Sequence, residues 1–83
     1  MGHLAKELQK YYIKHHGKLL FTNGSTLNQL AFQMWEKLHY SQIDASVLSK
    51  VINGKRLFTP SQLDVFCLLL DIDAKDRSKL YFS

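Results

Sequence analysis

Two stretches of this sequence carry a complete signal for the start of a helix. Residues 26–29 (TLNQ) and 59–62 (TPSQ) each place a threonine three positions before a glutamine, so the two side chains can satisfy free backbone N–H groups at a helix start. The second stretch also has proline at the first helical position, where no N–H is needed. We therefore expect a helix from 26 to about 38 with one apolar stripe, and a helix over 60–71 that is apolar nearly all round and central to the core.

The first part of the chain also has a helical pattern. Apolar and aromatic residues recur at helical spacing over 3–16, and Gly17 lies where a left-handed C-terminal cap would end a helix. Residues 18–21 (KLLF) have no obvious partner strand, although Asn23-Gly24 is a strong turn signal that can also close a hairpin. This part of the sequence predicts one helix followed by a turn.

Capping residues mark two further helices. Asp44 and Gly54 bracket a helix over 44–53, and Asp73 precedes a short helix over 74–82. With no internal repeat and no linker, the pattern predicts an all-α fold, a compact domain of five short helices.

Length and composition limit what this domain can be. Its 83 residues, 46% of them hydrophobic, suffice for one core, so we expect a single domain over 1–83, either a whole protein or the first part of a longer one. The single cysteine, Cys67, excludes an internal disulfide framework, and no Cys/His set, His15 and His16 included, has metal-ligand spacing. The longest apolar run, Val65–Leu70, is far below the roughly 20 residues that span a bilayer. Because the first sixteen residues alternate charged and apolar groups, we expect no export signal there. We expect a cytoplasmic protein without a metal, cofactor or small-molecule ligand.

Positive charge is concentrated in the first two thirds of the chain. The net charge is +4; residues 1–56 carry 8 Lys/Arg against 3 Asp/Glu, whereas residues 57–83 carry 3 against 4. A basic bias of this size suits a polyanion such as nucleic acid, although it is modest and many basic proteins bind none.

Residues 44–56 (DASVLSKVINGKR) combine an apolar helix face with a polar, cationic one. Ser46, Lys50 and Asn53 share a stripe roughly 10 Å long, and Ser49 lies beside it. A helix that reads DNA needs such an arrangement, because one face anchors it in the core while short polar and cationic groups reach base edges and phosphates.

The order of a capped helix, a turn, a helix ending in NGKR and a capped apolar helix resembles the phage-repressor-like (Cro/Xre-type) helix-turn-helix domains. In these, a consensus near S-x-I-x-x-x-I-x-N-G-K-R closes the recognition helix. The matching positions are Leu48, Ser49, Lys50, Val51, Asn53, Gly54, Lys55 and Arg56. The resemblance covers roughly residues 26–72, with the motif itself at about 26–56.

This resemblance implies a lambda-repressor-like five-helix fold, in which 3–16, 60–71 and 74–82 are supporting helices. It also implies binding of double-stranded DNA by a bacterial or phage transcriptional regulator, usually as a homodimer. The residues implied to face bases are Ser46, Ser49 and Lys50, and those implied to lie near the DNA backbone are Asn53, Lys55 and Arg56. Thr26, Asn28 and Gln29 are weaker candidates for phosphate contacts, because N–H groups at a helix start attract phosphate.

Other interpretations stay open at this point. The cations can form an ordinary solvated face, Asn53-Gly54 can act only as a helix cap, and Asp44 suits a cap better than a reader of cytosine. The rival function is a protein-interaction or dimerisation module that depends on exposed apolar groups such as Tyr40, Leu57 and Phe58. Single-stranded RNA binding ranks lower, and no arrangement of catalytic residues indicates an enzyme.

Overall fold

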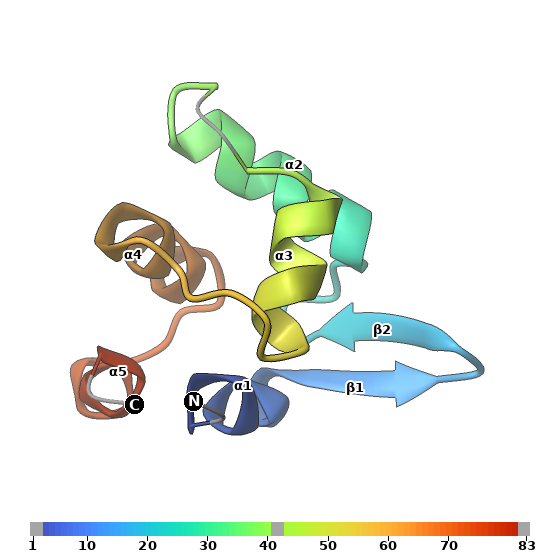
Figure 1. The fold of residues 1–83 in the computed structure, drawn as a ribbon, viewed down its shortest axis with the longest axis horizontal. Helices are drawn as coiled ribbons and strands as arrows, with labels where there is room; N and C mark the ends of the chain where they lie inside the picture. The colour runs from blue at the N-terminus through green and yellow to red at the C-terminus, as the bar shows by residue number, and fades with distance from the viewer. Residues whose placement is uncertain (1–2, 41–42, 82–83) are drawn as a thin grey trace.

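The structure is a computed structural model that describes residues 3–40 and 43–81, and in these residues five α-helices accompany one antiparallel hairpin (Figure 1). The expected all-α, lambda-repressor-like fold is therefore wrong, because the fold is a small α+β one. Its elements in chain order are α1 (His3–Leu8), the 3-10 turn η1 (Gln9–Tyr11), β1 (Tyr12–His15), β2 (Lys18–Phe21), α2 (Leu27–Lys37), α3 (Ala45–Ile52), α4 (Pro60–Leu69) and α5 (Ala74–Tyr81).

The hairpin replaces the second half of the helix predicted over 3–16. β1 and β2 pair in antiparallel register from Tyr12↔Phe21 to His15↔Lys18, which leaves a two-residue turn of His16 and Gly17. Both turn residues have positive φ, 50° and 75°, as the tight turns that match the twist of a hairpin require. Gly17 thus serves a hairpin turn instead of a helix cap, and the segment KLLF finds its partner strand in residues that had been assigned to a helix.

The predicted helix starts are confirmed in atomic detail. The N–H of Gln29 donates to Thr26 Oγ1 (3.3 Å) while Gln29 Oε1 accepts from the N–H of Thr26 (2.9 Å). Thr59 and Gln62 form the same reciprocal pair at 3.2 and 3.0 Å. Asp44 caps α3 by accepting from the N–H of Val47 at 2.9 Å. These bonds join residues three apart, which is why the sequence alone predicted them.

The core is built around Phe66 of α4, which is fully buried. Its ring meets Tyr11 and Phe21 edge-on, with centroids 6.4 and 6.0 Å apart, and Phe58 at 5.2 Å. The base of the hairpin, the helix α4 and the loop before it therefore share one aromatic cluster. The expectation that α4 is central to the core is confirmed, although its apolar residues are not all buried, since Leu68 is 61% exposed.

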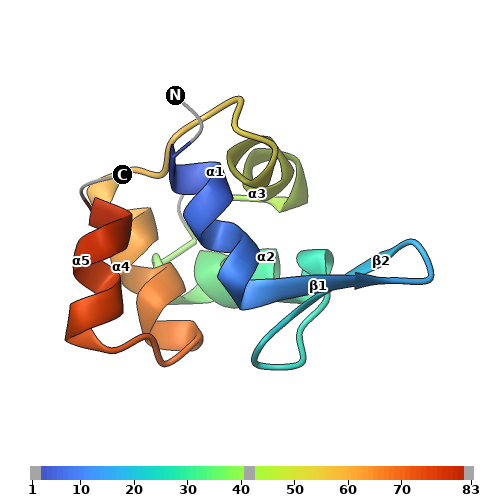
Figure 2. The ribbon, with the colours of Figure 1, turned by 90° about the horizontal axis from the view of Figure 1, so that it is seen from below.

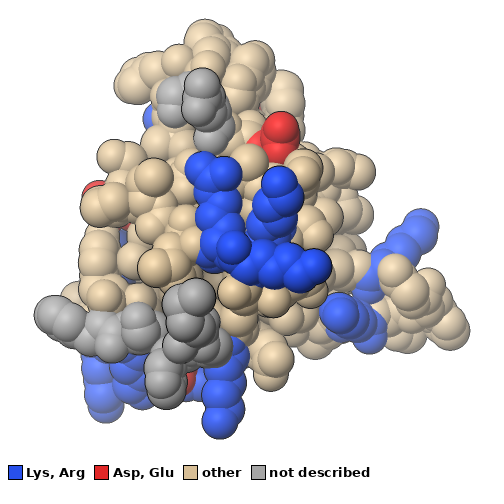
Figure 3. Space-filling model, viewed as in Figure 1, with Lys and Arg blue, Asp and Glu red and all other residues tan. Residues whose placement is uncertain are grey.

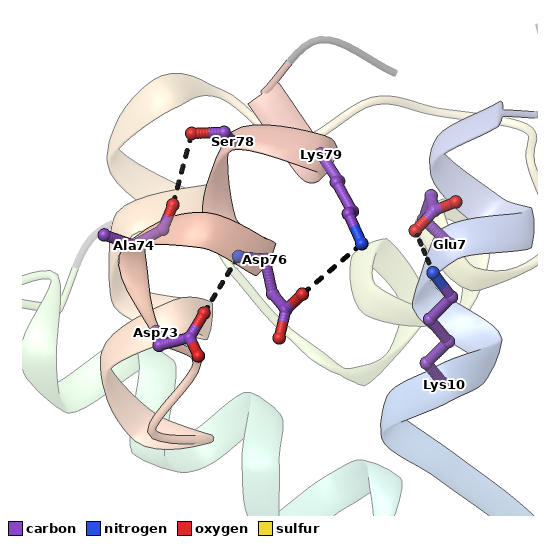
Figure 4. A network of polar contacts seen from close by, with 7 residues as sticks. All are labelled: Glu7, Lys10, Asp73, Ala74, Asp76, Ser78 and Lys79. Atoms are coloured by element: carbon purple, nitrogen blue, oxygen red, sulfur yellow. Dashed lines mark hydrogen bonds and ion pairs between the residues drawn. The ribbon is translucent and has the colours of Figure 1, made fainter.

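Helices α1 and α5, the first and last helices of the described chain, lie side by side (Figures 1 and 2). Leu4, Leu8 and Leu80 are buried in the common core here. Ion pairs in this region join residues close in sequence, Glu7 of α1 with Lys10 of η1 at 2.7 Å and Asp76 with Lys79 of α5 at 3.6 Å (Figure 4). Exposed pairs of this kind contribute little to stability, so apolar contact holds the two helices together.

Two helices end on a left-handed residue that is not glycine. His39 after α2 has φ 56° and Asp71 after α4 has φ 53°, and in each case the next N–H reaches back to the helix, from Tyr40 to the Trp35 carbonyl (2.9 Å) and from Ile72 to the Cys67 carbonyl (3.0 Å). This conformation strains any residue with a Cβ atom, whereas glycine adopts it freely.

We expect His39→Gly to raise the free energy of unfolding by about 0.5–1 kcal/mol, because it removes this strain and the exposed imidazole gives up no packing. Chemical denaturation measures the change. His39→Ala is the control and should bring no such gain, since it keeps the Cβ atom. A glycine variant less stable than the wild type would contradict the prediction.

Candidate nucleic-acid interface

Helix α3 presents a buried face and an exposed face, as its sequence predicted. Leu48, Val51 and Ile52 are buried in the core, against α2 and α1, whereas Ser46, Lys50 and Asn53 are exposed and Ser49 is half-buried. These contacts anchor α3 in the core through its buried face. Its exposed face offers two hydroxyls, an amide and an ammonium group.

The segment after α3 folds back in a Schellman motif, the hydrogen-bonded C-terminal cap that glycine favours. The N–H of Lys55 donates to the Lys50 carbonyl (2.8 Å) and that of Gly54 to the Val51 carbonyl (3.1 Å), while Gly54 has φ 77°. The predicted cap at Gly54 is thereby confirmed. It turns the chain so that Lys55 and Arg56 follow directly on the last turn of the helix, which carries Lys50.

These three cations lie in a part of the surface with little negative charge. No Asp or Glu occurs between residues 45 and 63, and four of the seven acids of the chain lie within 64–76. Lys50, Lys55 and Arg56 are exposed, and within residues 3–40 and 43–81 the ion pairs involve other lysines. Figure 3 shows Lys and Arg side chains gathered over α3 and the loop after it. We call Lys50, Lys55 and Arg56 the cationic patch.

Asp44 is the acidic residue nearest to α3 in the chain, and its side chain is the N-cap of that helix. Its Oδ1 atom accepts from the N–H of Val47. This negative charge at one end of α3 and the cationic patch at the other give the helix a polarity along its axis. A phosphate chain would be attracted to the C-terminal end of α3 and repelled from its start.

The Asn53 side chain is engaged within its own helix. Its Nδ2 donates to the Ser49 carbonyl (2.9 Å) and to Ser49 Oγ (3.3 Å), which uses both hydrogens of the amide. Only the amide oxygen is left, and it cannot donate to a phosphate or bond adenine in the two-point manner that Asn uses. In this conformation Asn53 stabilises the end of α3, and contact with DNA requires another rotamer.

The candidate phosphate contacts at the start of α2 are also partly engaged in hydrogen bonds within the protein. Thr26 Oγ1 and Gln29 Oε1 form the capping box, which also uses the N–H groups of these two residues. The N–H group of Asn28 remains, because the first turn of a helix has no intrahelical acceptor for it, whereas Leu27 lies beside the antiparallel bridge between Leu20 and Thr26. A phosphate at this helix start would therefore be held by the backbone N–H of Asn28, with the exposed side chain of Asn28 beside it.

A shallow apolar hollow of about 400 Å³ lies between α2 and α3. Its lining residues are Asn28, Ala31, Phe32, Trp35, Ile43, Asp44 and Ala45. Phe32 and Tyr40, 56% and 70% exposed, flank Trp35, with ring centroids 5.7 and 4.6 Å from it. Trp35 is half-buried on the apolar stripe of α2, whereas Phe32 lies off that stripe. An aromatic residue off the apolar stripe of an amphipathic helix was the sequence signal for this exposed group.

Cys67 and the histidines offer no sign of reactive chemistry. Cys67 is fully buried, and burial raises the pKa of its thiol, so the reactive thiolate is disfavoured. His15 and His16 are exposed at the tip of the hairpin instead of at a helix end. In the part of the chain that the structure describes, no group of three or more His, Cys, Asp or Glu residues is arranged to hold a metal ion.

We expect the Cys67 thiol of the folded protein to be unreactive toward an aromatic disulfide reagent at pH 8 and to react fully in denaturant. The physical reasons are its lack of solvent contact and its raised pKa. Absorbance of the released thiolate measures the reaction. Rapid stoichiometric labelling of the folded protein would show that the core opens at α4.

Comparison of this chain with protein-family models, with curated proteins and with solved structures found no match. The resemblance to Cro/Xre-type domains therefore rests on the residues of the motif alone. None of the helices in the described residues is long and apolar enough to cross a membrane.

Proposed function

We propose that this protein binds double-stranded DNA sequence-specifically and regulates transcription, with α3 in the major groove and the cationic patch on the adjoining backbone. The observation that carries this proposal is the amphipathic character of α3. Its apolar face is anchored in the core, and its exposed face bears Ser46 and Lys50. The patch continues beyond its C-terminus in a stretch without acidic residues.

The chemistry of these residues supports a division of roles. Lys50 projects from the last turn of α3 and suits guanine O6 and N7, or a phosphate, whereas Ser46 and Ser49 are short enough to let the helix backbone approach the groove. Lys55 and Arg56 lie in the loop and suit phosphates. The similarity of 48–56 to the recognition segment of Cro/Xre-type proteins agrees with this division. A cytoplasmic location and a homodimer are part of the proposal.

Selection of bound duplexes from a random DNA pool at near-physiological salt, followed by sequencing, tests the proposal. An enriched motif establishes base readout, and a palindromic motif gives the dimer and the spacing of its half-sites. Absence of enrichment, with binding that disappears as salt is raised, leaves only electrostatic attachment and contradicts sequence-specific recognition.

Replacement of Lys50 by alanine separates the two roles of this residue. If the ammonium group reads a base, we expect a loss of about 1–3 kcal/mol in binding free energy and a relaxed preference at one position of the selected motif. Titration of duplexes altered at single positions measures both. An equal loss on all sequences would instead identify a phosphate contact.

A protein-interaction module is the second candidate, and the exposed aromatic group beside the hollow favours it. Phe32 lines the hollow between α2 and α3, Tyr40 exposes its ring beside Trp35, and Leu57 is 60% exposed. Phe58, in contrast, is half-buried against Phe66 and has a structural role. This function predicts a partner interaction that survives Lys50→Ala and Lys55→Ala but is lost with Phe32→Ser or Tyr40→Ser.

A further inference from the structure

The hairpin of β1 and β2 extends away from the helices, from a buried base to an exposed tip (Figures 1 and 2). At the base, Phe21 is 3% exposed and contacts Tyr12 and Phe66, with ring centroids 5.9 and 6.0 Å apart. The N–H of Thr22 donates to the Tyr11 carbonyl at 2.9 Å, which ties β2 to the chain before β1. The outer half of the hairpin is thus held from one end only, by the core that also anchors α3.

The tip of the hairpin is cationic. Lys14, His15, His16 and Lys18 are all exposed there, and residues 8–35 contain no Asp or Glu. Lys10, at the base, is engaged with Glu7 at 2.7 Å, whereas among the described residues the ion pairs leave out Lys14 and Lys18. Figure 3 shows Lys and Arg side chains on the hairpin in the same view that shows those over α3. The basic surface of the molecule therefore has two parts, the cationic patch and the hairpin tip.

The pairing register gives each face of the hairpin one lysine. Lys14 lies opposite Leu19 on one face, and Lys18 lies opposite His15 on the other. A strand of four residues is about 13 Å long, close to the width of the major groove, roughly 12 Å. The hairpin is thus long enough to carry its cations from the base beside α1 to a phosphate chain bordering the groove.

We propose that this hairpin is a second DNA-binding element, in which Lys14 and Lys18 contact the sugar-phosphate backbone of the same duplex, outside the groove that α3 occupies. This inference rests on the proposed function of α3. The contact adds affinity and orients α3 but reads no bases, since ammonium groups on phosphates carry no sequence information. A simpler role of Lys14 and Lys18, keeping other strands from pairing with the hairpin edges, predicts no effect on DNA binding.

The test uses the duplex enriched with the wild-type protein. We expect the double variant Lys14→Gln and Lys18→Gln to bind it roughly ten- to thirtyfold more weakly near physiological salt, and the slope of log affinity against log salt to become shallower by about 2. The matched control is Lys37→Gln with Lys75→Gln, which removes the same charge from the end of α2 and from α5. This control should leave the slope nearly unchanged. Circular dichroism melting checks that both variants fold.

Ethylation interference on the same duplex locates the contacts. Phosphates at which ethylation blocks the wild type should form two groups, and the hairpin variant should lose only the group farther from the enriched motif. A wild type that binds specifically, with a hairpin variant of unchanged slope and interference pattern, overturns the inference and leaves the role of α3 intact. A wild type without an enriched motif overturns both.

Discussion

Replacement of Phe66 by alanine should lower the free energy of unfolding by about 3–5 kcal/mol. Phe66 is fully buried, and its ring packs against Tyr11, Phe21 and Phe58. Truncation therefore leaves a cavity where the 3-10 turn η1, the base of the hairpin and the loop before α4 meet. A domain of this size has little stability in reserve. We therefore expect a large unfolded fraction of the variant at 37 °C.

Urea denaturation followed by circular dichroism measures this loss. Leu68→Ala is the matched control, because Leu68 belongs to the same helix but is 61% exposed, and its truncation should change stability by less than about 0.5 kcal/mol. Similar losses in the two variants would contradict a core centred on Phe66 and would indicate that the outer side of α4 is covered.

Removal of the cationic patch should have the largest effect on the proposed function. We expect Lys50→Ala combined with Lys55→Ala and Arg56→Ala to weaken binding to the selected duplex roughly a hundredfold near physiological salt, and to make the salt slope shallower by 2 to 3. The reason is that three exposed cations in a stretch without acids are placed to displace counterions from DNA. Fluorescence anisotropy at several salt concentrations measures both quantities.

The control for this variant removes the same charge elsewhere, by Lys37→Ala, Lys75→Ala and Lys79→Ala on α2 and α5. It should bind nearly as the wild type does, apart from a small uniform loss through the lower net charge. If the two triple variants weaken DNA binding equally, the attraction to DNA depends on the net charge of the protein and not on the position of the cationic patch.

Much of the helical structure was predictable because its signals are local. The capping pairs Thr26 with Gln29 and Thr59 with Gln62, the cap Asp44 and the left-handed Gly54 each involve residues within one turn. Their geometry follows from covalent reach and from the four free N–H groups of every helix start, whatever the rest of the chain does. The exposed stripe of α3 follows in the same way from the position of its buried face.

The hairpin could not be predicted by this reasoning. Leu4, Leu8, Tyr11 and Tyr12 fit a helical stripe, and Gly17 fits a helix end as well as a hairpin turn. Tyr12 and Ile13 favour strands, but a two-stranded ribbon is marginal in water and forms here because Phe21 and Tyr11 pack on Phe66, more than forty residues further along the chain.

The sequence by itself determined where α2 to α5 begin, how α3 is capped, and which of its residues face away from the core, since these depend on interactions within a few residues. Only the tertiary structure decided that residues 12–21 form a hairpin, that the Asn53 amide bonds within its own helix, and that Phe32 is exposed beside α3. These features depend on which distant surfaces meet. Contacts between residues far apart in the chain gain or lose free energy only once the core has formed, and no local pattern specifies them.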